Sequence, residues 1–159
     1  MAQPTIVFFG YDGPQGPPKV VIGTIMFSTG QRGNILESMF IKLRRSEATQ
    51  TFSRWVYGNS KNARASGLYV GIEGVTDNHH FLIPSDGTQY QFLPGEYELE
   101  IYGSLINRKP SMLLKRVQIF LSSEEANSLN HREVGVMFNW SPEIRKYVSE
   151  TRRMPAFVR

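Results

Sequence analysis

The stretch Glu96-Tyr97-Glu98-Leu99-Glu100-Ile101 alternates charged and apolar residues without interruption. Because successive side chains of a β-strand point to opposite faces, this pattern predicts a strand whose apolar face is buried. The run from Leu113 to Leu121 repeats the pattern, since Val117, Ile119 and Leu121 share one face. Together the two runs predict neighbouring strands of a sheet that covers a hydrophobic core.

The three glutamates of the first run are expected to line the solvated face of this sheet. Arg116 and Gln118 share the outward face of the second run, so cross-strand pairing with the glutamates is expected. A ladder of carboxylates could also suggest acid/base catalysis, which needs one desolvated carboxyl group. The solvated face is the simpler interpretation.

Short strand patterns separated by turn signals extend outward from this pair in both directions. Glycine, proline and Asp-Gly or Asn-containing turns recur about every ten residues. Eight or nine such strands are typical of an all-β, two-sheet β-sandwich, with an immunoglobulin-, C2-, arrestin- or jelly-roll-like topology. Besides the central pair, the predicted strands cover 5–9, 19–28, 35–43, 51–57, 68–73, 79–83 and 134–140.

The C-terminal part predicts one or two short helices. Ser122 or Ser123 can cap one or two helical turns over 122–129, where glutamates suit the positive end of a helix dipole. Ser141-Pro142 resembles a second helix start, and apolar residues follow at helical spacing in 144–148. The same residues could instead extend the edge of a sheet.

Length and composition limit the class of protein. A chain of 159 residues with 40% hydrophobic residues predicts a single domain, 1–159, with a core of its own. The absence of cysteine excludes disulfides, thiolate metal sites and a cysteine nucleophile. No apolar run reaches the roughly 20 residues of a membrane span, and no signal peptide is evident, so a cytoplasmic location is expected, with export by a leaderless route left open.

The net charge of +4 carries little information about partners. Basic residues occur as scattered pairs with glutamates between them, which is typical of a soluble surface and disfavours nucleic-acid binding. A steep salt dependence would be expected of a nucleic-acid partner.

No catalytic, cofactor or metal motif is found in the chain. It lacks a G-x-S-x-G motif and a phosphate-binding glycine loop. Asp77 and His79 share a strand face and could meet at one ion, but no third ligand accompanies them and a polar turn is the favoured interpretation. His80 would point to the opposite face, and the aspartates are too dispersed for a calcium cluster. No catalytic residue, metal or cofactor is therefore predicted.

The strongest hint of a binding surface is aromatic. Trp55, Tyr57 and Tyr69, with Arg54 and the polar loop 58–67, could form a stacking platform for a sugar or a partner peptide. The alternative is that Trp55 and Tyr57 belong to the core, and burial is the commoner fate of large aromatic residues. Trp140, next to Ser141-Pro142, invites the same two interpretations.

These observations predict a non-catalytic binding or scaffold module that acts through protein–protein contacts or self-association into an oligomer. Exposed strand edges, which strand-rich chains carry, are suited to both. A lectin-like carbohydrate-binding β-sandwich is the runner-up. An enzyme whose site assembles only in the fold is the third alternative.

Overall fold

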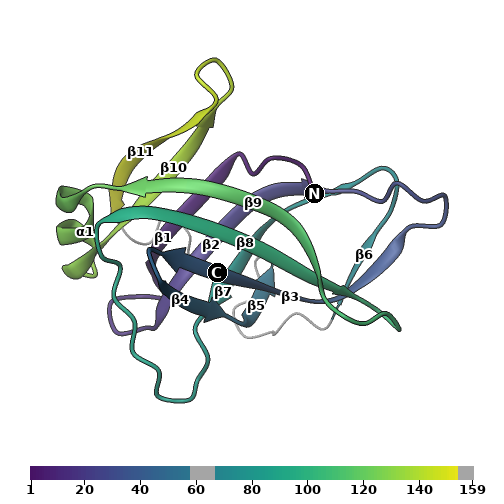
Figure 1. The fold of residues 1–159 in the computed structure, drawn as a ribbon, viewed down its shortest axis with the longest axis horizontal. Coiled ribbons are helices and arrows are strands. Elements are labelled where there is room, and N and C mark those ends of the chain that lie inside the picture. The colour runs from purple at the N-terminus through teal and green to yellow at the C-terminus, as the bar shows by residue number, and fades with distance from the viewer. Residues whose placement is uncertain (58–66, 154–159) are drawn as a thin grey trace.

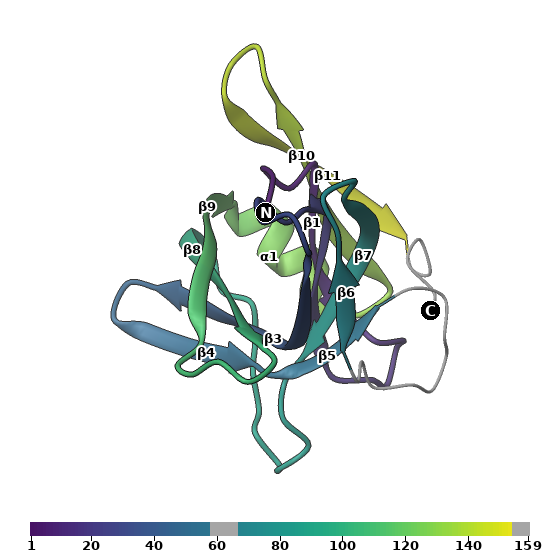
Figure 2. The ribbon, with the colours of Figure 1, turned by 90° about the vertical axis from the view of Figure 1, so that its right-hand side faces the viewer.

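The computed structural model describes residues 1–57 and 67–153, which form two β-sheets packed face to face and one helix near the C-terminus (Figures 1 and 2). The all-β sandwich expected from the sequence is thereby confirmed. Its elements in chain order are β1 (Ile6–Tyr11), β2 (Pro18–Met26), β3 (Asn34–Arg45), β4 (Ala48–Phe52), β5 (Arg54–Tyr57), β6 (Leu68–Val70), β7 (Val75–Leu82), β8 (Gly95–Leu105), β9 (Met112–Leu121), α1 (Ser123–Asn130), β10 (Val134–Ser141) and β11 (Lys146–Arg153).

One sheet has the strand order β11-β10-β1-β2-β7-β5, and the other has the order β4-β3-β8-β9, with β6 paired to the start of β3. The two runs from which the fold was predicted are β8 and β9, which pair antiparallel with Tyr97 opposite Ile119 and Leu99 opposite Val117. The end strands β9 and β11 each pair with one neighbour only within the described residues. Each of these two strands therefore has one edge without a neighbouring strand in the part of the chain that the structure describes.

The core lies between the inner faces of the two sheets and is rich in aromatic rings. Phe9 contacts Phe92, Tyr97 and Phe138, with ring centroids 5.0, 5.4 and 5.2 Å away, respectively. Helix α1 closes one end of this core through its buried residues Ala126 and Leu129 (Figure 2). Strands from both sheets therefore contribute to one continuous hydrophobic cluster.

The predicted strand 51–57 is wrong as a single element. It divides at Ser53 into β4, which belongs to one sheet, and β5, which belongs to the other. Phe52 and Trp55 are both buried in the core because each faces it from its own sheet. Alternation within a short segment cannot reveal this, since it reports which face is buried and not which sheet a residue joins.

The C-terminal predictions have a mixed outcome. Helix α1 forms as expected, and Ser122 caps it in a reciprocal capping box with Glu125. The second helix that Ser141-Pro142 suggested is not formed. The chain turns over 142–145 and returns as β11, so the sheet-edge alternative holds. Arg145 completes the turn with a φ of 55°.

The glutamate face of β8 is less uniform than the sequence suggested. Glu96 is exposed, and Glu98 accepts a hydrogen bond from Gln118 at 2.8 Å, as cross-strand pairing predicts. Glu100, however, is only 4% exposed and lies between two arginines, at 3.6 Å from Arg44 and 3.4 Å from Arg116. Burial tends to raise its pKa, but a hydrogen bond from Tyr102 and the two arginines outweigh burial and lower the pKa.

The outer face of the six-stranded sheet is also partly apolar and buried. Phe8, Val21 and Met137 form a second small cluster there. The ring of Phe8 lies next to Gly10 on its own strand β1 and next to Gly135 on the neighbouring strand β10. A Cβ atom at Gly10 would lie 2.6 Å from this ring, and one at Gly135 would lie closer still. Both positions therefore require glycine because of the ring and not because of a turn.

Candidate binding cleft

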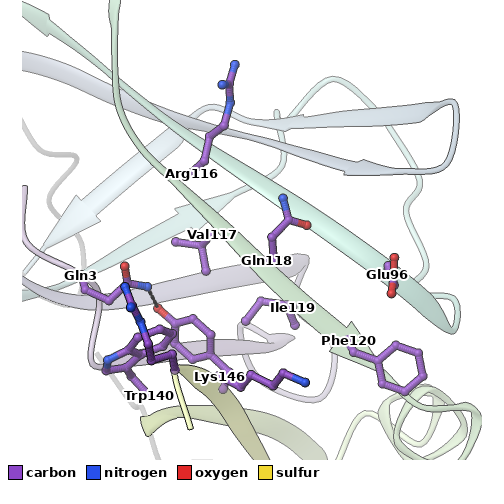
Figure 3. A pocket seen from close by; sticks show the side chains of 11 residues that line it. Gln3, Glu96, Arg116, Val117, Gln118, Ile119, Phe120, Trp140 and Lys146 are labelled. Atoms are coloured by element: carbon purple, nitrogen blue, oxygen red, sulfur yellow. Dashed lines mark hydrogen bonds between the residues drawn. The ribbon is translucent and has the colours of Figure 1, made fainter. Parts of the chain in front are cut away.

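A cleft of about 600 Å³ opens between the outer edge of β9 and the hairpin formed by β10 and β11 (Figure 3). This volume lies within the range of about 300–1,000 Å³ that is usual for ligand sites. The side chains that line the cleft are a mixture of aromatic, aliphatic, amide and charged groups. They are Gln3, Glu96, Arg116, Val117, Gln118, Ile119, Phe120, Trp140, Arg145, Lys146 and Tyr147.

The β9 wall is lined by five consecutive residues, 116–120. Along this stretch Val117 and Ile119 face the core, whereas Arg116, Gln118 and Phe120 face outward. Side chains of both parities meet one cavity only where the cavity faces the edge of the strand. The cleft therefore runs along the open edge of β9, where a strand presents unpaired backbone N–H and C=O groups.

The opposite wall is the turn end of the hairpin. Trp140 and Tyr147 are direct partners across β10 and β11, with ring centroids 5.1 Å apart. The Tyr147 hydroxyl donates a hydrogen bond to the Pro4 carbonyl at 2.7 Å. It accepts a second bond from Gln3 Nε2 at 2.8 Å, which is the dashed line at Gln3 in Figure 3. Burial raises the pKa of Tyr147 to about 12, so the hydroxyl stays protonated at neutral pH. The Trp140 backbone N–H also bonds the Thr5 carbonyl at 2.9 Å, so the N-terminal segment anchors this wall.

The charges in the lining are mostly positive. Arg116, Arg145 and Lys146 contribute three cations, and Glu96 contributes one anion, so the lining has a net charge of +2. Arg116 already forms an ion pair with Glu100 on β8. Arg145 and Lys146 are exposed and form no ion pair with any other residue that the structure describes. Two cations are thus available to a ligand at the hairpin side of the cleft.

Of the aromatic residues that the sequence singled out, Trp140 lines the cleft, whereas Trp55, Tyr57 and Tyr69 do not. Trp55 is only 4% exposed and faces the core, 5.3 Å from Tyr57 between ring centroids. Arg54 and Tyr57 are half-buried, and the Tyr57 hydroxyl donates to the Gly67 carbonyl. Tyr69 is 62% exposed on β6, which belongs to the other sheet. The alternative interpretation, in which Trp55 belongs to the core, agrees with this burial.

A ligand-binding role for these four residues stays a prediction. Residues 58–66 of the polar loop assigned to the same platform lie outside the described residues.

His79 is fully buried and hydrogen-bonded to Trp55. Its Nδ1 accepts a hydrogen bond from Trp55 Nε1 at 3.1 Å, which places the proton of the neutral ring on Nε2. Burial lowers the pKa of His79 to about 4, and the negative charge of Asp77 opposes this shift only in part. Within residues 1–57 and 67–153, no three histidine or acidic side chains gather as metal ligands around Asp77 and His79 or elsewhere.

The sequence alone does not reveal this cleft. Its patterns place Arg116 and Gln118 on an outward face and make Trp140 a binding candidate, but nothing in them connects these three residues. The connection depends on β9 being the end strand of its sheet and on β11 forming in place of a helix. Strand order cannot be deduced from alternation, and Ser141-Pro142 favoured the helix.

In comparisons with known proteins, no family model, no curated protein and no solved structure matches the chain. Among the described residues, no helix is long and apolar enough to cross a membrane.

Proposed function

We propose that this chain is a non-catalytic protein-interaction module that binds an extended segment of a partner in the cleft along β9. The observation that carries the proposal is the lining of the cleft by consecutive residues at the open edge of a strand. An added strand gains affinity from main-chain hydrogen bonds and specificity from the pockets that receive its alternate side chains. The five residues 116–120 span about 17 Å at about 3.4 Å per residue, a length that suits a strand of four or five residues.

The chemistry of the walls supports a particular kind of segment. Trp140 and the exposed Phe120 offer apolar contact, while Arg145 and Lys146 offer positive charge without a described partner. A segment with one large apolar side chain and one acidic side chain would contact both the apolar residues and the cations. A second copy of the chain is the other protein that could occupy the same edge, which would make the module an oligomer.

Carbohydrate binding is the second candidate function. In the cleft its aromatic platform would be Trp140, in place of the Trp55 that the sequence suggests. Trp140 lines the cleft together with the amides of Gln3 and Gln118, and an aromatic face with hydrogen-bonding groups in the same cleft suits a sugar ring. Burial of Trp55 leaves it less suited to this role than Trp140.

A cytoplasmic location remains part of the proposal, and the lack of cysteine is consistent with a reducing compartment. Imaging of a tagged full-length chain in its native cell tests this part.

The proposal is tested by selecting linear peptides from a random display library on the purified chain and following amide hydrogen exchange of the complex. Strand addition should protect alternate amides within 116–120, because every second N–H of an edge strand points away from the sheet. Selection of no peptide, or protection confined to other strands, would reject the proposal. Retention on a glycan array without peptide selection would favour the carbohydrate alternative.

Charge reversal supplies a matched pair of variants for the selected peptide. Lys146→Glu, at the cleft end of β11, should weaken binding of an acidic peptide by about tenfold or more, since it both removes an attraction and adds a repulsion. Arg153→Glu, at the far end of the same strand, makes the same charge change away from the cleft and should leave affinity within about twofold. Sedimentation velocity of the free chain reports whether a second copy occupies the edge.

A further inference from the structure

A second surface lies at the end of the sandwich away from α1 and the β10–β11 hairpin, on the right-hand side of Figure 1. Six large apolar side chains are exposed there by 39% to 62%, and we refer to them as the apolar end. They are Ile25, Phe27, Ile35, Tyr69, Ile72 and Ile106. Ile25 faces outward from the six-stranded sheet, Ile35 and Tyr69 face outward from the other sheet, and Phe27, Ile72 and Ile106 lie on the connections at this end. Exposed apolar residues gathered at one end of a molecule suit a contact surface better than scattered ones do.

Hydrogen bonds connect the segments that carry the apolar end. The Ser28 N–H bonds the Gly71 carbonyl at 3.0 Å, and the Ile106 N–H bonds the Ile35 carbonyl at 3.0 Å. The Tyr69 hydroxyl donates to the Arg32 carbonyl at 3.2 Å. The connections 27–33 and 71–74 are thereby held together, and the connection 106–111 is tied to the start of β3, where Ile35 pairs with Tyr69 of β6. Ordering them on contact would cost little conformational entropy.

The charges on these connections are mainly positive. Arg32, Arg108 and Lys109 are exposed and have no ion-pair partner in the described part of the chain. Glu73 is the one carboxylate on the three connections, so their net charge is +2. Apolar side chains at loop ends with cations beside them match an anionic lipid surface, where acyl chains accept the former and headgroups attract the latter.

We propose that the apolar end docks on membranes that contain anionic lipid, without crossing them and without calcium. Phe27, Ile72 and Ile106 enter the region between headgroups and acyl chains, while Arg108 and Lys109 lie at the headgroup level. This proposal does not depend on the peptide-binding cleft, which occupies the other end of β9.

The test is sedimentation of the full-length chain with phosphatidylcholine vesicles, with and without phosphatidylserine, in the presence of a chelator. The chain should sediment with the phosphatidylserine vesicles and much less with the neutral ones. The double variant Phe27→Ser/Ile72→Ser should weaken binding by about tenfold or more. Arg108→Glu/Lys109→Glu should weaken it by at least about 20-fold, since each cation near the surface contributes about fivefold.

Matched control variants come from the cleft. Phe120→Ser removes an aromatic residue that is 63% exposed, and Arg145→Glu/Lys146→Glu makes the same charge change as the variant at the apolar end. Both should bind the vesicles as the unaltered chain does, and thermal unfolding confirms that each variant is folded.

Absence of binding to phosphatidylserine vesicles overturns the proposal, as does equal loss in the cleft variants. A dimer in sedimentation velocity that Phe27→Ser/Ile72→Ser dissociates overturns it too, because the apolar end would then be covered by a second copy.

Discussion

His79 illustrates how one buried residue can link stability to pH. The hydrogen bond from Trp55 fixes its tautomer, and complete burial penalises the charged ring, so the folded chain keeps a proton off this side chain down to a pKa of about 4. An exposed histidine in the unfolded chain takes up that proton near its ordinary pKa of 6.5. Between these two values the unfolded state binds more protons than the folded state.

We therefore expect the free energy of unfolding to fall as the pH decreases from about 6.5 to about 4, and His79 to contribute about 3 kcal/mol of that loss. Its contribution is fully present above pH 6.5. Urea unfolding of the unaltered chain and of His79→Gln between pH 6.5 and pH 4 isolates the contribution of His79. The acidic residues titrate alike in the two proteins, so their effect cancels in the difference. His131→Gln, at an exposed histidine, is the control. An NMR titration in which His79 protonates near pH 6.5 would contradict the prediction.

Tyr147 is the residue that fastens the hairpin to the N-terminal segment. We expect Tyr147→Phe to lower the free energy of unfolding by about 1–2 kcal/mol, because it leaves the Pro4 carbonyl and the Gln3 amide without their shared partner. Tyr69→Phe removes a hydroxyl that also bonds a backbone carbonyl, but on the exposed surface, and should cost less than about 0.5 kcal/mol. Equal losses measured by urea unfolding would show that burial of the Tyr147 bonds is unimportant.

At the scale of elements, the packing of the Phe8 ring on strands β1 and β10 depends on the absence of a side chain at Gly135. Gly135→Ala should destabilise the fold by about 1–3 kcal/mol, since the added methyl group overlaps this ring. Gly30→Ala is the control, because the nearest atom to its Cβ would be 3.7 Å away. In a double-mutant cycle, Phe8→Leu should recover part of the loss at Gly135. If the losses of the two single variants, measured by urea unfolding, simply add in the double variant, overlap with the Phe8 ring is not the cause of the destabilisation by Gly135→Ala.

The elements were predictable to the extent that their residues carry local patterns. Alternation in 96–101 and 113–121 identified β8, β9 and their buried faces, and serine capping identified α1. What could not be predicted depends on distant partners. Nothing near Ser53 indicates that the chain leaves one sheet for the other, and nothing near Pro142 decides between a helix start and a hairpin turn. The cleft depends on both strand order and that turn, so its residues could be noted singly but not assembled.

At the scale of the whole molecule, a single hydrophobic core joins the two sheets, and the chain passes between them at Ser53. We expect the protein to unfold in one cooperative transition, with far-UV circular dichroism and tryptophan fluorescence changing together. The calorimetric enthalpy should be about 110 kcal/mol near 60 °C for 159 residues at about 0.7 kcal/mol per residue. Two separable transitions, or a van't Hoff enthalpy well below the calorimetric one, would contradict the single-domain prediction.

The open edge of β9 faces other copies of the same chain whenever the cleft is empty, and unpaired strand edges readily add to one another. Arg116, Arg145 and Lys146 border this edge, and in two approaching copies these cations repel. That repulsion reaches about 8 Å at physiological ionic strength but only about 3 Å in 1 M salt. We therefore expect these cations to oppose edge-to-edge association of the purified protein, and concentrated salt, commonly used to keep basic proteins in solution, to promote that association.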